Sequence, residues 1–195
     1  MKHIRSNIGF IIALMFLAAM IFVPEFKSSV LRGFMKVGMF KPNVGLPSDD
    51  PLEKPSILIE APNVGFISAK GEKLNIHNTK NKVIFLNFWA TWCPPCIAEM
   101  PSIQALKNKL KNKEAVIFAM VDADSNFTSS LSFMRKNDYD LPVYVQTSAA
   151  PESFFDGSLP TTIIINRQGK IVMKHVGVAN YDTKEMLTLL NGLSE

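Results

Sequence analysis

Both cysteines of this 195-residue chain lie in one short motif, Cys93-Pro94-Pro95-Cys96. Two thiols at this spacing serve as a structural disulfide, as half of a zinc site, as a haem attachment point or as a redox-active pair. Structural disulfides are common in short secreted chains whose cores are too small to hold the fold. Hydrophobic residues make up 47% of this chain, which is enough for a real core and argues against a purely structural role.

The histidines argue against zinc and against covalent haem. A zinc site needs four ligands, and His3, His77 and His175 all lie far from the cysteines in the sequence. Haem attachment needs a histidine directly after the second cysteine, where this chain has Ile97. We therefore expect no metal and no cofactor, and we interpret the pair as redox-active.

The motif lies where a hydrophobic run ends and a helical pattern begins. This places Cys93 near a helix N-terminus, where unpaired N–H groups and the helix dipole stabilise an anion. Such sites lower the pKa of a cysteine below its usual value of about 8.5. Cys93 is therefore the predicted nucleophile and Cys96, one turn further on, the resolving thiol. Of Trp89 and Trp92, which precede the pair, we expect one to shield it and the other to pack in the core.

The two residues between the cysteines favour a reducing protein. Neither Pro94 nor Pro95 has an N–H, so two potential donors to the Cys93 thiolate are missing. A thiolate with fewer hydrogen bonds keeps a higher pKa, and a less stable dithiol is a stronger reductant. The hypothesis is a reductant, not an oxidant with a potential near about −120 mV.

From about residue 56 onward, short strand-like runs alternate with helical patterns. This alternation predicts an α/β domain with a mixed sheet. The run Lys82–Ala90 is apolar enough for a central strand that is buried on both faces. The other expected elements are a hairpin around Lys70-Gly71, strands at 115–124 and 141–146, a strand pair at 161–177, and helices at 96–112, 128–137 and 182–193.

Polar residues and prolines set the expected helix boundaries. Thr128 or Ser129 is the expected N-cap of the middle helix, because hydroxyl side chains accept bonds from free N–H groups. Asp182 is expected to cap the last helix, and Gly192 to end it. Pro101 predicts a kink in the helix that follows the cysteines.

The N-terminus predicts a membrane anchor. Lys2 and Arg5 precede a run without charges, Ile8–Val23. The run is slightly short for a spanning helix of about 20 residues and long for a signal-peptide core of about 7–15. We expect a tail at 1–7, an anchor at 8–26, an amphipathic segment and proline-rich linker at 27–56, and a folded domain at 57–195. A cleaved signal peptide is the alternative, although no pair of small residues two apart precedes Pro24.

The motif and its surroundings resemble a known family. "VIFLNFWATWCPPC", followed by Glu99 and Pro101, and the later "SLPTTIIIN" are similar to the TlpA/ResA-like, membrane-anchored branch of the thioredoxin superfamily. The resemblance covers about Ile57–Leu193. It implies a thioredoxin-like fold, in which a central mixed sheet is flanked by helices.

The resemblance also implies a substrate groove beside the disulfide. Pro160 would be cis, a form found for only about 5–6% of X–Pro bonds. The Leu159 backbone would then be left to pair with an extended client chain. Trp92 and Thr161 complete the expected substrate-binding set.

One departure from the family concerns the acid beneath the cysteines. Other thioredoxins carry a buried acid where this chain has Asn87, which cannot accept a proton. Glu99, three residues after Cys96 on the same helix face, is the substitute that the resemblance implies for tuning the thiols and relaying protons. The alternatives are that Glu99 serves only the helix dipole and that Asn87 is a structural core amide. We expect Asp122 and Asp124 to end a strand.

The resemblance implies a thiol:disulfide oxidoreductase that reduces disulfides in client proteins. Apocytochrome c is a candidate client, and a membrane thiol donor would supply electrons. The expected location is the cytoplasmic (inner) membrane, with a single span and the domain on the periplasmic side. The alternative is a copper carrier that uses both thiolates and a histidine. A net charge of +4, with scattered lysines, argues against a nucleic-acid partner.

Overall fold

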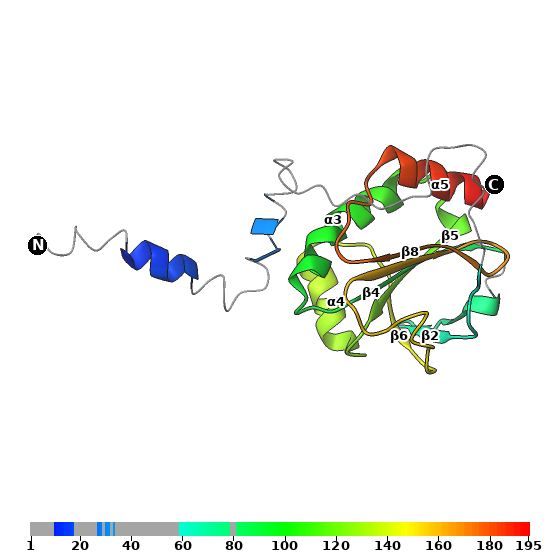
Figure 1. Cartoon of the computed structure of the whole chain (residues 1–195), viewed down its shortest axis with the longest axis horizontal. Coiled ribbons are helices and arrows are strands. Elements are labelled where there is room, and N and C mark those ends of the chain that lie inside the picture. The colour runs from blue at the N-terminus through cyan, green and yellow to red at the C-terminus, as the bar shows by residue number, and fades with distance from the viewer. Residues whose placement is uncertain (1–9, 18–26, 29, 32, 34–58, 79–80) are drawn as a thin grey trace, which may run out of the picture.

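An eight-stranded mixed sheet forms the centre of the domain (Figure 1). The structure, a computed structural model, describes residues 10–17, 27–28, 30–31, 33, 59–78 and 81–195. The spatial order of the strands is β1-β8-β7-β4-β5-β6-β2-β3. In chain order the strands are β1 Ile59–Glu60, β2 Gly65–Ser68, β3 Lys73–Asn75, β4 Val83–Trp89, β5 Val116–Asp122, β6 Val143–Gln146, β7 Thr161–Ile165 and β8 Lys170–Val176.

Strand β4 occupies the middle of the sheet, as predicted. It pairs in parallel with β5 and antiparallel with β7. All seven of its residues are buried. Such a strand must be apolar on both faces, and the one polar residue of its run, Asn87, is thereby placed inside the core.

The two faces of the sheet have different covers. Alternating side chains of β4 point to opposite faces, so Phe85 and Trp89 join one hydrophobic cluster and Leu86 and Phe88 the other. The first cluster packs beneath the helices, and the second beneath the β2–β3 hairpin and the segment before β7.

The helices are α3 Pro94–Lys109, α4 Phe127–Lys136 and α5 Lys184–Ser194, with 3-10 turns η1 Ile76–Asn78 and η2 Lys113–Ala115.

Three predicted helix boundaries are wrong. Asn126, and neither Thr128 nor Ser129, caps α4, and its side chain accepts the Ser129 N–H. Thr183, and not Asp182, caps α5, whose last residue is Ser194, two positions beyond Gly192.

Asp182 lies next to the true cap but has another partner. It forms an ion pair with Lys109 at 2.5 Å, which ties the start of α5 to the end of α3. Helix α3 itself continues through Pro101 without ending there.

Both predicted turns are present. Gly71 has a φ of 81°, in the left-handed region that favours glycine, and it joins β2 to β3. Gly169 has a φ of 76° and completes the turn between β7 and β8. The α/β architecture with a mixed sheet is therefore confirmed.

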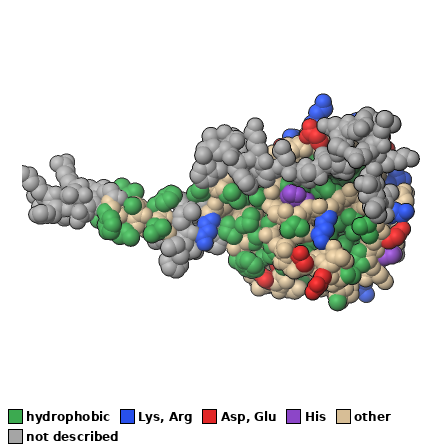
Figure 2. Space-filling view, viewed as in Figure 1, with side chains coloured by type: hydrophobic (Ala, Val, Ile, Leu, Met, Phe, Trp, Pro, Cys, Tyr) green, Lys and Arg blue, Asp and Glu red, His purple; other side chains and the backbone are tan. Residues whose placement is uncertain are grey.

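The N-terminal part is described only in fragments. Residues 10–17 are helical, and their large apolar side chains are exposed (Figure 2). Among the described residues, no helix is long and apolar enough to cross a membrane. The predicted tail 1–7, most of the anchor 8–26 and most of the segment 27–56 lie outside the described residues.

Candidate active site

The two cysteines form a disulfide at the start of α3. Their Cα atoms are 5.3 Å apart. Cys93 is the N-cap of the helix, and its Sγ accepts the Cys96 N–H at 3.3 Å. Pro94 and Pro95 occupy the first helical positions, where a missing N–H breaks no helical hydrogen bond. The sequence therefore folds locally so that Cys93 Sγ lies at a helix N-terminus and accepts one N–H, that of Cys96.

The two sulfurs and the two tryptophans differ in access to solvent. Cys93 is 4% exposed and Cys96 is fully buried, which suits an attacking and a resolving thiol respectively. Trp89 is fully buried, whereas Trp92 is 58% exposed beside the pair. Trp89 therefore packs in the core, as predicted for one of the two tryptophans, and the shielding role predicted for the other stays a prediction.

The aspartates that follow β5 are structural, as predicted. Asp122 is buried and accepts three hydrogen bonds, from the N–H groups of Asp124 and Asn126 and from the Ser130 hydroxyl. Asp124 accepts the indole N–H of Trp92 at 2.6 Å. The end of β5 thus orients the exposed tryptophan.

The peptide between Leu159 and Pro160 is cis, as the resemblance implied. The Pro160 carbonyl accepts the Gly177 N–H, but no hydrogen bond within the described residues uses the Leu159 backbone. The Leu159 side chain packs on the cluster that contains both cysteines. The Thr161 side chain is fully buried, and its hydroxyl donates to the Ser158 carbonyl. This hydroxyl therefore supports the loop and does not face a client.

Glu99 is buried completely, so it is not a surface residue that serves only the helix dipole. One carboxylate oxygen accepts Asn87 Nδ2 at 2.8 Å, and the other accepts the Ala179 N–H at 3.2 Å. Burial raises the pKa of Glu99 to about 8, although the hydrogen bonds from Asn87 and Ala179 oppose this rise. Glu99 can therefore gain or lose a proton near neutral pH.

Two residues that the sequence reasoning missed extend this network. Asn87 Nδ2 also donates to Thr162 Oγ1 at 2.9 Å, and the Tyr181 hydroxyl donates to the same oxygen at 2.6 Å. Burial, and next the charge of Glu99, raise the pKa of Tyr181 well above its usual value, so this phenol stays neutral. Asn87 is a core amide, as predicted, and it also contacts the acid.

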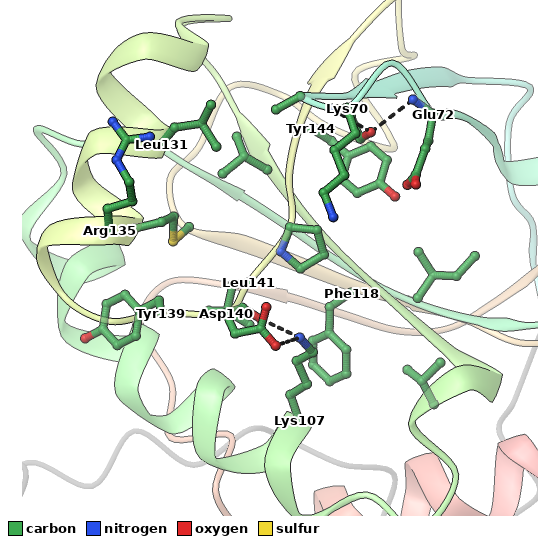
Figure 3. Close-up of a pocket in the computed structure, with 17 residues that line it drawn as sticks. Lys70, Glu72, Lys107, Phe118, Leu131, Arg135, Tyr139, Asp140, Leu141 and Tyr144 are labelled. Atoms are coloured by element: carbon green, nitrogen blue, oxygen red, sulfur yellow. Dashed lines mark hydrogen bonds and ion pairs between the residues drawn. The ribbon is translucent and has the colours of Figure 1, made fainter.

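Among the hollows formed by the described residues, two are large. The larger, of about 480 Å³, lies between the β2–β3 hairpin, α4 and the segment before β6 (Figure 3). Lys107 at its edge is paired with Asp140, and no cysteine or cis-proline residue lines it. The smaller, of about 380 Å³, is lined by Phe88, Asp122 and Phe155 at the carboxyl ends of β4 and β5. Neither cysteine nor Pro160 lines this hollow, and Phe88 belongs to the hydrophobic cluster on the face of the sheet opposite the cysteines.

No cluster in the part of the chain that the structure describes could hold a metal ion through three or more His, Cys, Asp or Glu side chains. His175 is half-buried, and its Nε2 has no hydrogen-bond partner among the described residues.

The sequence is similar to those of known proteins. Residues 59–190 match the Redoxin family. The chain is 38% identical to thiol-disulfide oxidoreductase ResA of Bacillus cereus over 136 residues, which is 69% of this chain and 76% of the relative. It is 36% identical to ResA of Bacillus anthracis over the same shares of the two chains.

Solved structures have the same fold. A thiol:disulfide interchange protein of the thioredoxin family from Chlorobium tepidum superposes with a TM-score of 0.55 at 22% identity, over 70% of this chain and 99% of that one. The thioredoxin domain of a thiol-disulfide oxidoreductase from Bacteroides vulgatus gives 0.56 at 17% identity, over 72% and 99%. The fold is thus thioredoxin-like, and the chain belongs to the Redoxin family as a thiol-disulfide oxidoreductase of the ResA type.

Proposed function

We propose that this oxidoreductase is a membrane-tethered reductant of disulfides in extracytoplasmic client proteins. The observation that carries the proposal is the position of Pro94 and Pro95 at the first two places of α3. Of the residues in the first turn, Cys96 supplies an N–H to Cys93 Sγ, whereas the two prolines cannot. A thiolate with few donors is less stable, which favours giving electrons to a client.

The chemistry proceeds by two exchanges. In the reduced protein, the Cys93 thiolate attacks one sulfur of a client disulfide, and the other client sulfur leaves as a thiolate that takes a proton. The Cys96 thiol then loses its proton and attacks Cys93 Sγ. This step releases the second client thiolate and forms the Cys93–Cys96 disulfide present in this structure. Two electrons pass to the client, and a thiol donor must reduce the protein again.

Glu99 is the proposed base for Cys96. It follows Cys96 by three residues on α3, so the two side chains share a face of the helix. Both are fully buried, away from water that could take the proton instead. With its pKa raised to about 8 by burial, Glu99 is matched to a thiol.

The client would bind along the cis-proline loop. The Leu159 backbone is free to pair with an extended chain, and the exposed Trp92 ring offers an apolar contact beside the sulfurs. An unfolded client fits this mode because its cysteines lie in extended chain. Apocytochrome c, whose cysteines must be reduced before haem attachment, is the proposed client.

The uncharged run Ile8–Val23 supports a membrane tether. Its described part, residues 10–17, is helical and exposes apolar side chains. Large domains after a first span are translocated largely regardless of nearby charge, so we place the domain on the periplasmic side. Deletion of residues 1–26 should move the protein from the membrane fraction to the soluble fraction, and externally added protease should digest the domain of the full chain in spheroplasts.

Trapping tests the proposal directly. A Cys96→Ser variant keeps the nucleophile but cannot resolve the mixed disulfide, so it should accumulate covalent adducts with exported, cysteine-containing proteins. Cys93→Ser is the matched control and should trap none. Tight, stoichiometric copper binding by the full chain, without disulfide reduction, would instead support a copper carrier.

A further inference from the structure

A row of buried polar side chains crosses the sheet beneath Glu99. The antiparallel register of β4 and β7 places Asn87 directly opposite Thr162, so both side chains lie on the same face. Glu99 lies at one end of the row, and Tyr181, which precedes α5, at the other. All four residues are fully buried. Buried polar groups must find hydrogen bonds inside the protein, so their donors and acceptors can be counted.

Each oxygen of ionised Glu99 accepts one N–H group. Asn87 Nδ2 has two hydrogens, of which one goes to Glu99 Oε1 and the other to Thr162 Oγ1. The Ala179 N–H donates to Glu99 Oε2. Neither N–H group can accept a proton that is added to the carboxyl.

The missing acceptor is present on the same amide. Among the described residues, Asn87 Oδ1 has no hydrogen-bond partner. A half-turn of the Asn87 amide about its Cβ–Cγ bond exchanges Oδ1 with Nδ2. The oxygen then faces Glu99, where it can accept the acid proton.

We propose that Asn87 is a positioning residue for Glu99 whose amide turns over each time the carboxyl gains or loses a proton. The nitrogen faces the ionised carboxylate, and the oxygen faces the protonated acid. Thr162 serves both settings, because its hydroxyl oxygen accepts Asn87 Nδ2 in the first and its hydrogen can be donated to Oδ1 in the second. Tyr181 keeps Thr162 bonded in either setting.

The amide turn gives the resolving step a place for its proton. When Cys96 is deprotonated, the hydrogen moves from its Sγ to a Glu99 oxygen, and Asn87 turns to accept the new O–H. No electron passes through the amide. This part rests on the proposed role of Glu99, whereas the coupling between the Glu99 proton and the Asn87 amide does not depend on it.

Few titratable groups share this environment. On α3 they are Cys93 and Cys96, which do not titrate while joined as a disulfide. Tyr181 faces the network from the segment before α5, and His175 lies opposite Thr162 on β8. At the positions that pair across β4 and β7 beneath Glu99, the residues are Asn87 and Thr162, neither of which titrates.

Nuclear magnetic resonance of the oxidised, full-length chain in detergent tests the proposal. The Asn87 side-chain amide, labelled with ¹⁵N and assigned by its absence in Asn87→Leu, is observed well below and well above pH 8, about the pKa of Glu99. Above it, the Nδ2 protons should show Overhauser contacts to the Thr162 methyl and to the Glu99 side chain. Below it, these contacts should disappear. Contacts that persist unchanged at both pH values would overturn the amide turn.

A second measurement follows the chemical shift of the Glu99 carboxyl carbon against pH, which gives the midpoint of its titration. Variants of the residues around Glu99 are compared by this midpoint. Asn87→Leu removes a donor to the charged form, and bonds to charged groups are about twice as strong as neutral ones. The pKa of Glu99 should therefore rise. At a given pH below the midpoint, the ratio of ionised to protonated Glu99 should be about tenfold lower than in the parent. Thr162→Val removes a partner of both settings and should leave the midpoint near that of the parent. An Asn87→Leu midpoint equal to that of the parent would contradict the positioning role.

Ser130→Ala is the matched control. It deletes another buried hydroxyl, which donates to Asp122 at 2.7 Å and does not contact Glu99. Its Overhauser contacts and its midpoint should match those of the parent. All of these readouts come from the disulfide form, so they stand even if the protein does not reduce the proposed clients.

Discussion

Two buried carboxylates in this domain have opposite surroundings. Asp122, at the end of β5, accepts three hydrogen bonds, of which two come from backbone N–H groups and one from Ser130. Glu99, on α3, accepts two, and one of these comes from a side chain that can turn. The pKa of Glu99 rises to about 8 because burial outweighs its donors. Two buried carboxylates thus differ in their donors, because Asp122 has three and Glu99 has two, of which one belongs to a side chain.

The largest expected effect is on catalysis through Glu99. Glu99→Gln keeps the shape and the acceptor oxygen but removes the proton site. General bases contribute factors of about 10²–10⁴, so turnover in an insulin disulfide reduction assay should fall at least about 100-fold. Melting temperature should change little. Parental turnover in Glu99→Gln would show that Glu99 is not needed as a general base.

Asp122 should show the reverse pattern. Asp122→Asn turns an acceptor of three donors into a group with its own N–H hydrogens, so a buried donor loses its partner. Denaturant unfolding should show a loss of about 2 kcal/mol in the free energy of unfolding. Turnover per folded molecule should stay within about twofold of the parent, because the loss acts on stability. A large loss of turnover in Asp122→Asn, with parental stability, would contradict the structural role of Asp122.

The pH dependence of the free energy of unfolding should report the raised pKa of Glu99. The folded pKa of Glu99, about 8, lies above the ordinary value of 4.5 for a glutamate, so the native state holds this proton where the unfolded chain has lost it. Stability is therefore fully present below the unfolded value and declines as pH rises from there through the folded value. Denaturant unfolding of the oxidised protein across this window measures the decline. Glu99→Gln should flatten the curve, and an equal slope in both proteins would contradict the raised pKa.

The smallest effect concerns an exposed carboxylate near the same site. Asp124→Ala removes the acceptor of the Trp92 indole N–H. The free energy of unfolding should change by less than about 1 kcal/mol, because exposed polar contacts stabilise little. Trp92 fluorescence should shift, and KM for a disulfide peptide should rise more than kcat falls. A change in kcat alone would show that Asp124 takes part in the chemistry.

The fold was largely predictable because its two central strands, β4 and β5, are long apolar runs. The run that became β4 is short for a helix and rich in β-branched and aromatic residues, which favours a buried strand. The helix caps were less predictable, because several candidate residues stand next to each other. Asn126 and Thr183 act as caps through local geometry that neighbouring hydroxyl and carboxyl groups could equally have supplied.

The site was predictable as far as its local motifs extend. The cysteine pair and Pro160 lie in recognisable stretches, and Glu99 was implied by the family resemblance together with its helical spacing from Cys96. Thr162 and Tyr181 were missed because they meet Asn87 only through the pairing of β4 with β7 and the packing of the segment before α5. The second threonine of "LPTT" was the one available signal, since it could pair with a central strand. Contacts across the sheet require the register, which a single sequence does not show.

The most direct test of the account is the pH dependence of the resolving step. The mixed disulfide on Cys93 is prepared with a model thiol, and its release by Cys96 is timed by rapid quench in the parent and in Glu99→Gln. The account predicts a parental rate that rises with a midpoint near the Glu99 pKa of about 8, and a much slower variant without that midpoint. Superimposable profiles for the two proteins would show that the buried acid takes no part in the proton transfer.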